Sequence, residues 1–306
     1  MSATQTTFAL GISLMAPILW AALGELIVEQ SGVLNIGIEG VMLIGAFVSA
    51  IGYHFVGSLY VGLLAAIGSG LACGLVLSIL YVRLGTDQIV TGILFNVFAL
   101  GFTTTLYTKY LGGGVSNAFG NLHIPGLSSI PWLGPILFDQ NFLVYAAILA
   151  APLVYYLVHR TWFGLYARAA AENPRAVESA GLDVWRLRYP AVVLGCMLTA
   201  VGGATIVLST SGGFVAGLTS GRGYIALAVV VLARWNPYGA VLGSVLFGVA
   251  EALQFQVQNL GFLSKIPSDF VLMFPYIVTV VAVVFALGSR YPAACGIPFR
   301  PSAKSA

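Results

Sequence analysis

Long hydrophobic stretches recur along the whole chain and are separated by short polar segments. A helix needs about 20 apolar residues to cross the roughly 30 Å hydrocarbon core of a bilayer. Nine stretches approach that length, at about 8–27, 33–53, 59–82, 88–108, 141–159, 190–210, 223–235, 237–257 and 269–288. Because the ends of the stretches are uncertain, the pattern predicts an all-α, polytopic helical membrane protein with about nine transmembrane helices, within a range of eight to ten.

Two of the nine stretches depart from a plain helical span. The second contains Asn35 and Glu39 among several glycines, and the seventh is short and leads into Trp235-Asn236-Pro237. Irregular backbone at membrane depth is tolerated only where it is buried in protein or lines water. These two spans are therefore predicted to be broken or re-entrant.

Composition places the whole chain in the membrane. Mean hydropathy is +0.96, 59% of residues are hydrophobic and 8% are charged, whereas a soluble domain has about 25% charged residues. The 306 residues leave no room for a large soluble domain, so residues 1–306 are expected to form a single transmembrane domain. A net charge of +3 does not suggest nucleic-acid binding. The three widely spaced cysteines form neither a disulfide framework nor a metal-binding pattern.

Basic residues predict the orientation, because Lys and Arg concentrate in cytoplasmic loops. The segment 161–189, with Arg160 directly before it, is the most arginine-rich part of the chain and is placed in the cytoplasm. With nine crossings, ten basic residues then lie inside and three outside, which requires an external N-terminus and a cytoplasmic C-terminus. The inside residues are Arg83, Arg160, Arg168, Arg175, Arg186, Arg188, Arg234, Arg290, Arg300 and Lys304, and the outside ones are Lys109, Arg222 and Lys265.

The same topology assigns the remaining polar segments. The loop 109–140 becomes external, and its Gly, Ser, Asn and Pro content is that of a turn-rich segment. Such a loop could cap a pore, dock an external partner or only connect two spans. The C-terminal residues 289–306, with their prolines and basic residues, are predicted to be a short disordered end.

A short helix with clear end signals lies inside the segment 161–189. Asn173 suits the N-cap position, Pro174 suits the first helical position and Gly181 suits the C′ position. Glu172 precedes the helix, at the positive end of its dipole. An isolated helix of about seven residues, 174–180, is unstable in water. It must therefore pack on its own flanking helices or on another protein.

This segment resembles the coupling-helix region of permease subunits of ATP-binding-cassette (ABC) importers. The resemblance is to the family that carries simple sugars, nucleosides and branched-chain amino acids. Three further stretches support it, namely 24–40 (GELIVEQSGVLNIGIEG), 221–228 (GRGYIALA) followed by 233–237 (ARWNP), and 247–254 (FGVAEALQ). The match covers nearly the whole chain, in order. Ala171 and Ala233 depart from it, since glycine is expected at both positions.

The resemblance implies the fold and the partners of a type II importer permease in a bacterial cytoplasmic (inner) membrane. Two such subunits form the pore, two cytoplasmic ABC ATPase subunits drive transport, and an external binding lipoprotein delivers the substrate. Within this family, the chain resembles the short, nucleoside-type permeases most. Such permeases pair with a longer related permease, so a heterodimer is favoured. The ATPase-coupling residues would be Glu172, Asn173, Pro174, Arg175, Glu178 and Gly181.

No catalytic chemistry is apparent in the chain itself. No Gly-x-x-x-x-Gly-Lys-Ser/Thr loop occurs, so ATP and Mg²⁺ are expected on a partner ATPase and no cofactor on this chain. The three histidines are scattered near the ends of spans, and no metal-binding pattern or catalytic carboxylate pair stands out. The chain is therefore interpreted as a transport subunit and not an enzyme.

Polar residues inside the spans are the candidates for the substrate path. An ion in the bilayer costs at least about 2.5–3.5 kcal/mol, so each such residue needs a reason. Glu251, Gln254 and Gln258 form one stripe on the eighth span, which predicts either pore-lining groups or hydrogen bonds between helices. Asn35 and Glu39 either lie beside the path or satisfy freed backbone groups, and Asn96 could add to the path.

Glu25 and Glu29 lie near the end of the first span. Their expected role is structural or in gating, and not in contact with the substrate.

The leading hypothesis is inward, ATP-driven transport of a small polar solute. A nucleoside is preferred, then a simple sugar, then a branched-chain amide-like solute. The alternatives are a secondary transporter or channel powered by an ion gradient, and a membrane scaffold that transports nothing.

Overall fold

The structure is a computed structural model that describes residues 3–112, 118–123, 125, 128, 130–259, 273–285 and 291–301. Within these residues, seven helices are long and apolar enough to cross a membrane. They are α1 (Ala3–Glu29), α2 (Ile38–Val56), α3 (Leu59–Ser78), α4 (Gln88–Tyr110), α6 (Phe142–Arg160), α9 (Val184–Thr205) and α11 (Pro237–Asn259). Two of them continue as short π-helices, α3 into η1 (Ile79–Arg83) and α9 into η2 (Ile206–Ser211).

The polytopic helical fold is thus confirmed, whereas the count of nine spans is not. The helix at the seventh predicted span, α10 (Arg222–Leu232), has 11 residues. The helix at the ninth, α13 (Phe274–Phe285), has 12. Part of the ninth predicted stretch, 269–288, lies outside the described residues.

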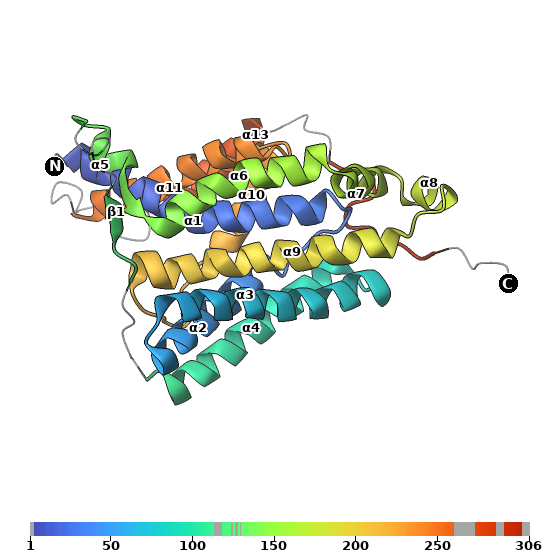
Figure 1. Ribbon diagram of the computed structural model, residues 1–306, viewed down its shortest axis with the longest axis horizontal. Coiled ribbons are helices and arrows are strands. Elements are labelled where there is room, and N and C mark those ends of the chain that lie inside the picture. Colours follow the sequence, from blue (N-terminus) through green and yellow to red (C-terminus); the bar gives the residue numbers. More distant parts are fainter. Residues whose placement is uncertain are drawn as a thin grey trace.

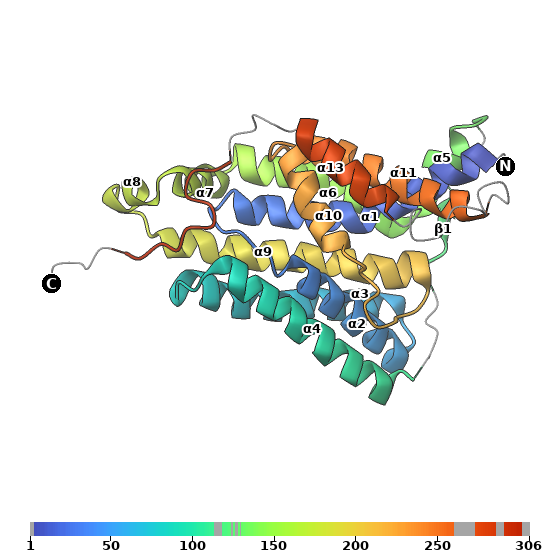
Figure 2. The same cartoon turned by 180° about the vertical axis from the view of Figure 1, so that it is seen from behind.

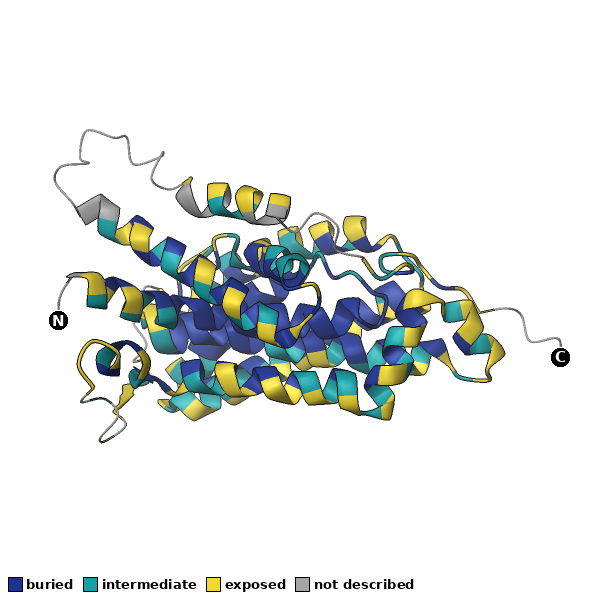
Figure 3. Cartoon of the chain, turned by 90° about the horizontal axis from the view of Figure 1, so that it is seen from above, coloured by how far each residue is buried: buried dark blue, intermediate teal, exposed yellow. Residues whose placement is uncertain are grey.

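Helix α1 runs through the middle of the bundle (Figures 1 and 2), in contact with α9, α11, α10 and α6. Helix α2 packs against both α3 and α9, which also contact each other, and α4 packs on α2. Figure 3 shows the buried residues gathered in the central helices and the exposed ones on the outer faces. An exposed apolar exterior around a buried centre is the expected arrangement for a helical bundle in lipid.

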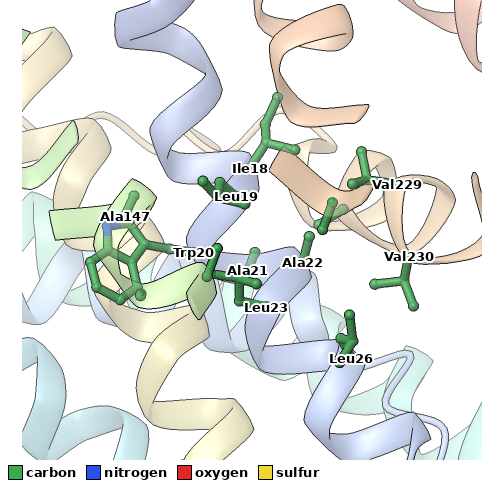
Figure 4. Close-up of a cluster of buried hydrophobic side chains, with 14 of the residues drawn as sticks. Ile18, Leu19, Trp20, Ala21, Ala22, Leu23, Leu26, Ala147, Val229 and Val230 are labelled. Atoms are coloured by element: carbon green, nitrogen blue, oxygen red, sulfur yellow. The ribbon is translucent and has the colours of Figure 1, made fainter. Parts of the chain in front are cut away.

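Close backbone contacts hold α1, α2 and α9 together. A Cβ atom on Gly203 of α9 would lie 1.9 Å from the carbonyl oxygen of Met42, and one on Gly24 of α1 would lie 2.4 Å from that of Gly195. Only glycine fits where helix backbones approach this closely. Around α1, larger side chains complete the core: Trp20 lies near Ala147 of α6, and Ala22 lies on the side of Val229 and Val230 of α10 (Figure 4).

The two spans predicted to be broken are both incomplete helices. Residues 33–37 are not helical and α2 begins at Ile38, so the span 33–53 is interrupted in its first part, as expected for a broken span. Helix α10 begins after a run of turns and ends at Leu232. Both helices begin partway along the bundle (Figure 2). Their first turns therefore leave backbone N–H groups inside the protein, where other groups must satisfy them.

The bundle has two distinct ends (Figure 1). One, the α5 end, holds the N-terminus, α5 (Gly134–Leu137) and the antiparallel strands β1 (Asn121–His123) and β2 (Asp139–Asn141). The other, the α8 end, holds α7 (Trp162–Glu172), α8 (Pro174–Ser179) and residues 291–301. The predicted loop 109–140 thus contains short elements of its own.

At the α8 end, α9 begins inside the predicted segment 161–189, because the Asp183 carboxylate accepts hydrogen bonds from Trp185 and Arg186 and starts the helix at Val184. The prediction of a disordered C-terminal end is wrong for the described residues 291–301. Within 291–301, the Ala294 amide donates to the Ala171 carbonyl at 2.8 Å, and the Phe299 side chain is buried. Burial of apolar surface and a backbone hydrogen bond fix these residues in place.

Candidate functional sites at the α8 end and at the broken helices

Helix α8 has the end structures that the sequence predicts. The Asn173 side chain accepts a hydrogen bond from the Ala176 amide at 3.1 Å, and Pro174 is the first helical residue. Gly181 takes the left-handed conformation, with φ of 82°, which glycine adopts without steric penalty. The helix ends at Ser179, one residue before the predicted end.

The candidate coupling residues differ in exposure. Glu172, Asn173 and Arg175 are exposed, and Pro174 and Glu178 are half-buried. Val177 is buried in a cluster with Ala170 of α7, Val184 of α9 and Phe299. One face of this short helix is therefore fixed to the bundle while the other is open to a partner.

Arg188 ties three segments together beneath α8. Its side chain is 1% exposed, its Nε donates to the Ser31 carbonyl at 3.2 Å, and its Nη1 donates to the Ile297 carbonyl at 3.4 Å. Its guanidinium also lies 6.0 Å from the centre of the Phe299 ring, a cation–π arrangement. The sequence predicts Arg188 only as a loop cation, because nothing in its local sequence marks it as buried.

A second junction at the α8 end joins α1 to the turn between α10 and α11. Arg234 and Trp235 in this turn both have left-handed backbone, with φ of 52° and 57°, which is uncommon for such side chains. The Trp235 indole donates to the Glu29 carboxylate at 2.5 Å, and Gln30 donates to the Trp235 carbonyl at 2.7 Å. The Tyr291 ring packs edge-on against Trp235 at 5.0 Å. These contacts support the structural or gating role expected for Glu29.

A cavity of about 290 Å³ opens beside this junction. It is lined by Gln30, Arg168, Ala171, Glu172, Arg234, Trp235 and Pro292. Nearby, burial first and the Glu29 carboxylate second raise the pKa of the Cys295 thiol well above its usual range. The thiol therefore stays neutral and unreactive near pH 7.

Glu39 lies where the two broken helices meet. Its Oε1 accepts hydrogen bonds from the Thr219 hydroxyl at 2.6 Å and the Gly221 amide at 2.8 Å, and its Oε2 accepts from the Gly223 amide at 2.7 Å. The carboxylate of α2 thus satisfies freed backbone donors of α10 and stands at the positive end of that helix.

Asn96 of α4 likewise satisfies backbone groups at the start of α2. Its Oδ1 accepts from the Gly40 amide at 2.8 Å, and its Nδ2 donates to the Ile36 carbonyl at 2.9 Å. The same Nδ2 donates to the Tyr224 hydroxyl at 2.8 Å. Tyr224 of α10 is 46% exposed, so this group reaches the surface of the subunit. No sequence pattern marks Tyr224 as a site residue, although it lies within the stretch 221–228 that supports the family resemblance.

Asn35 belongs to a separate, buried group. The backbone N–H of Asn35 donates to the Glu25 carboxylate at 2.9 Å, and the side-chain oxygen of Asn35 accepts from the Tyr81 hydroxyl at 3.2 Å. Asn35 and Glu25 are 1% and 0% exposed. The contacts of both residues are thus those of a structural group within this subunit.

The polar stripe predicted on the eighth span is divided in the structure. Glu251 forms an ion pair with Arg222, and both side chains are largely buried. Arg222, expected in an external loop, is thus paired with a carboxylate inside a span. Gln254 is 8% exposed, and the side chain of Gln258 lies outside the described residues. Their role in a pore stays a prediction.

Comparison with known proteins extends over most of the chain. A family model described as branched-chain amino acid transport system / permease component matches residues 7–283. No solved structure matches the chain.

Several curated proteins are similar over three-quarters or more of their length. The guanosine ABC transporter permease protein NupQ of Bacillus subtilis (strain 168) is 34% identical, covering 93% of each chain. The nucleoside ABC transporter permease protein NupC of Lactococcus lactis subsp. cremoris (strain MG1363) is 33% identical, covering 92% of this chain and 93% of NupC. The putative glucose ABC transporter permease protein TsgC13 of Haloferax volcanii is 34% identical over 80% of this chain and 75% of its own.

A second guanosine ABC transporter permease protein of Bacillus subtilis, NupP, is a more distant relative, 26% identical over 89% of this chain and 80% of its own. The family match covers far more than half of the chain, and its description agrees with a bundle of apolar helices that carries a capped helix at one end. The chain therefore belongs to the family of branched-chain amino acid transport system / permease components and is a multi-pass membrane permease subunit of the ABC type.

Proposed function

We propose that this chain is the pore-forming subunit of an ATP-driven importer for nucleosides. The observation that carries the proposal is the 33–34% identity to NupQ and NupC across more than nine-tenths of all three chains. Simple sugars are the second substrate class, since TsgC13 is similar over a smaller part of both chains.

The proposed orientation puts the α8 end in the cytoplasm and the α5 end outside, in a bacterial cytoplasmic membrane. The arginine-rich segment at the α8 end supports this orientation through the bias of basic residues toward the cytoplasm. The exposed face of α8 would then meet an ABC ATPase subunit that binds ATP and Mg²⁺, and this chain would bind no cofactor. The external end would receive solute from a binding lipoprotein.

A heterodimer with a related permease is favoured over a homodimer. Bacillus subtilis has two guanosine ABC transporter permease proteins that are similar to this chain, at 34% and 26% identity. The chain would take the place of the NupQ-like member. The partially exposed Asn96–Tyr224 group would face the path between the two subunits, because exposed polar groups at membrane depth are expected to face water or protein and not lipid.

Uptake measured in cells tests the substrate and the energy source together. Deleting the gene should abolish uptake of radiolabelled guanosine while leaving uptake of leucine unchanged, and expression of the wild-type chain should restore it. The double charge reversal Glu172→Lys with Arg175→Glu should not restore uptake, although the protein should accumulate in the membrane. Vesicles that contain this chain alone and accumulate guanosine without any ATPase would contradict the proposal and favour a secondary transporter.

A further inference from the structure

The described residues C-terminal to α13, in segment 291–300, form a surface together with α8. A cleft of about 300 Å³ has Pro174 and Arg175 of α8 on one side. The other side consists of five residues from the C-terminal segment 291–300, namely Ala294, Ile297, Pro298, Phe299 and Arg300. Neither α8 nor the segment forms this cleft alone.

The segment is held firmly enough to act as a wall. The backbone N–H of Ala294 donates a hydrogen bond to the Ala171 carbonyl, and the Ile297 carbonyl accepts one from the buried Arg188. Phe299 is buried in the cluster that also contains Val177 of α8. A partner that binds here would meet a preformed surface, so little ordering of the segment would oppose binding.

The exposed side chains define the chemistry of the cleft. Ile297 is 58% exposed, and Pro298, Arg175 and Arg300 are also exposed. An apolar floor flanked by two guanidinium groups favours a partner that brings an apolar side chain and at least one carboxylate.

The position of the cleft favours a protein partner over the membrane. Helix α8 projects beyond the ends of α6 and α9 (Figures 1 and 2), and the cleft lies between this helix and segment 291–300. Lipid headgroups are expected near the ends of the membrane-spanning helices, whereas a subunit that binds the exposed face of α8 would also lie against the cleft, because Pro174 and Arg175 line it. We propose that segment 291–300 is the second wall of the ATPase-docking site, and that an acidic segment of the ATPase subunit occupies the cleft. This inference rests on the proposed function.

Site-specific photocrosslinking tests the occupant directly. A benzophenone amino acid replaces Ile297 in the full-length chain, expressed together with the ATPase that co-purifies with the wild-type permease. A control chain carries the same probe at Arg186, which is exposed beside Asp183 but does not line the cleft. The position-297 probe should crosslink to a polypeptide with a Gly-x-x-x-x-Gly-Lys-Ser/Thr loop, and the position-186 probe should yield at least about tenfold less of this product.

Charge reversal gives an independent measure of the same site. Arg300→Glu should lower the amount of ATPase retained on the purified permease by about tenfold, as expected when a like charge meets an acidic partner. Arg186→Glu makes the same charge change outside the cleft and should retain the ATPase as the wild type does.

The outcomes separate this inference from the function on which it rests. If the wild-type chain retains no ATPase, the proposed function itself fails. If the wild type retains ATPase, but the 297 probe crosslinks only to lipid or Arg300→Glu binds ATPase as well as Arg186→Glu does, the inference alone is overturned.

Discussion

Replacing Glu39 by glutamine changes one atom of its side chain and should destabilise the junction of the broken helices. The carboxylate accepts from Thr219 and Gly221 through one oxygen and from Gly223 through the other. Glutamine has one oxygen and one NH₂ group, so one of these positions becomes a donor that faces another donor. The substitution also removes a negative charge from the start of α10.

The magnitude follows from these two losses. A buried donor without a partner costs about 1–3 kcal/mol, and a charge beside a partly buried helix end contributes up to about 2 kcal/mol. We therefore expect Glu39→Gln to lower the free energy of unfolding by about 2–4 kcal/mol, which for a chain of this size is a fall in Tm of roughly 4–8 °C.

Thermal unfolding of the purified protein in detergent, followed by size-exclusion chromatography after heating, measures this shift. Thr219→Val removes one hydrogen bond to the carboxylate and should cost about 1 kcal/mol. Glu172→Gln, at an exposed carboxylate, should leave Tm within about 1 °C of the wild type. A Glu39→Gln protein as stable as the Glu172→Gln control would refute the assignment of Glu39 as the cap of α10.

Three further predictions concern packing, coupling and the strained turn. Gly203→Ala places a Cβ 1.9 Å from the Met42 carbonyl oxygen and should prevent accumulation of folded protein in the membrane. Gly68→Ala is the control, because nothing lies within 4 Å of a Cβ at that position, and it should accumulate as the wild type does. Membrane fractionation with immunoblotting measures both. Asn173→Ala removes the cap of α8 and should destabilise that helix by about 1 kcal/mol. If the proposed function holds, this should lower the amount of solute carried per ATP hydrolysed in reconstituted vesicles, and Asn173→Asp should restore the ratio. Trp235→Phe takes the donor from the buried Glu29 carboxylate and should cost about 1–3 kcal/mol in a thermal-unfolding assay.

What sequence reasoning found correctly was encoded locally. The signals for α8 span nine residues, from Asn173 to Gly181, and each acts on its own backbone neighbours. The apolar stretches likewise predicted the long helices to within a few residues, apart from the first part of the second span and the start of α9 at Val184. Local backbone chemistry and hydrophobic length are both readable from one sequence.

The contacts that sequence reasoning missed join positions far apart in the chain. Glu39 meets Gly221 and Gly223 across about 180 residues, and Arg188 meets Ser31 across 157 residues. Phe299 looked like part of a disordered end because its apolar partners, Val177 and Val184, lie more than 100 residues earlier. A single sequence indicates that a polar or aromatic residue needs a partner, but not which residue provides it.

The hydrogen bonds at the broken helices also change which residues are the best candidates for the substrate path. A residue that lines a pore needs both access to water and spare hydrogen-bonding capacity. Gln254 is buried and so has little access to water, and Glu251 is paired with Arg222 and so has little spare hydrogen-bonding capacity. Tyr224 is 46% exposed, and its hydroxyl, which accepts from Asn96, can still donate to a solute. We therefore expect the path to pass the exposed side of Asn96 and Tyr224, where an aromatic ring with a fixed hydroxyl could contact the base of a nucleoside.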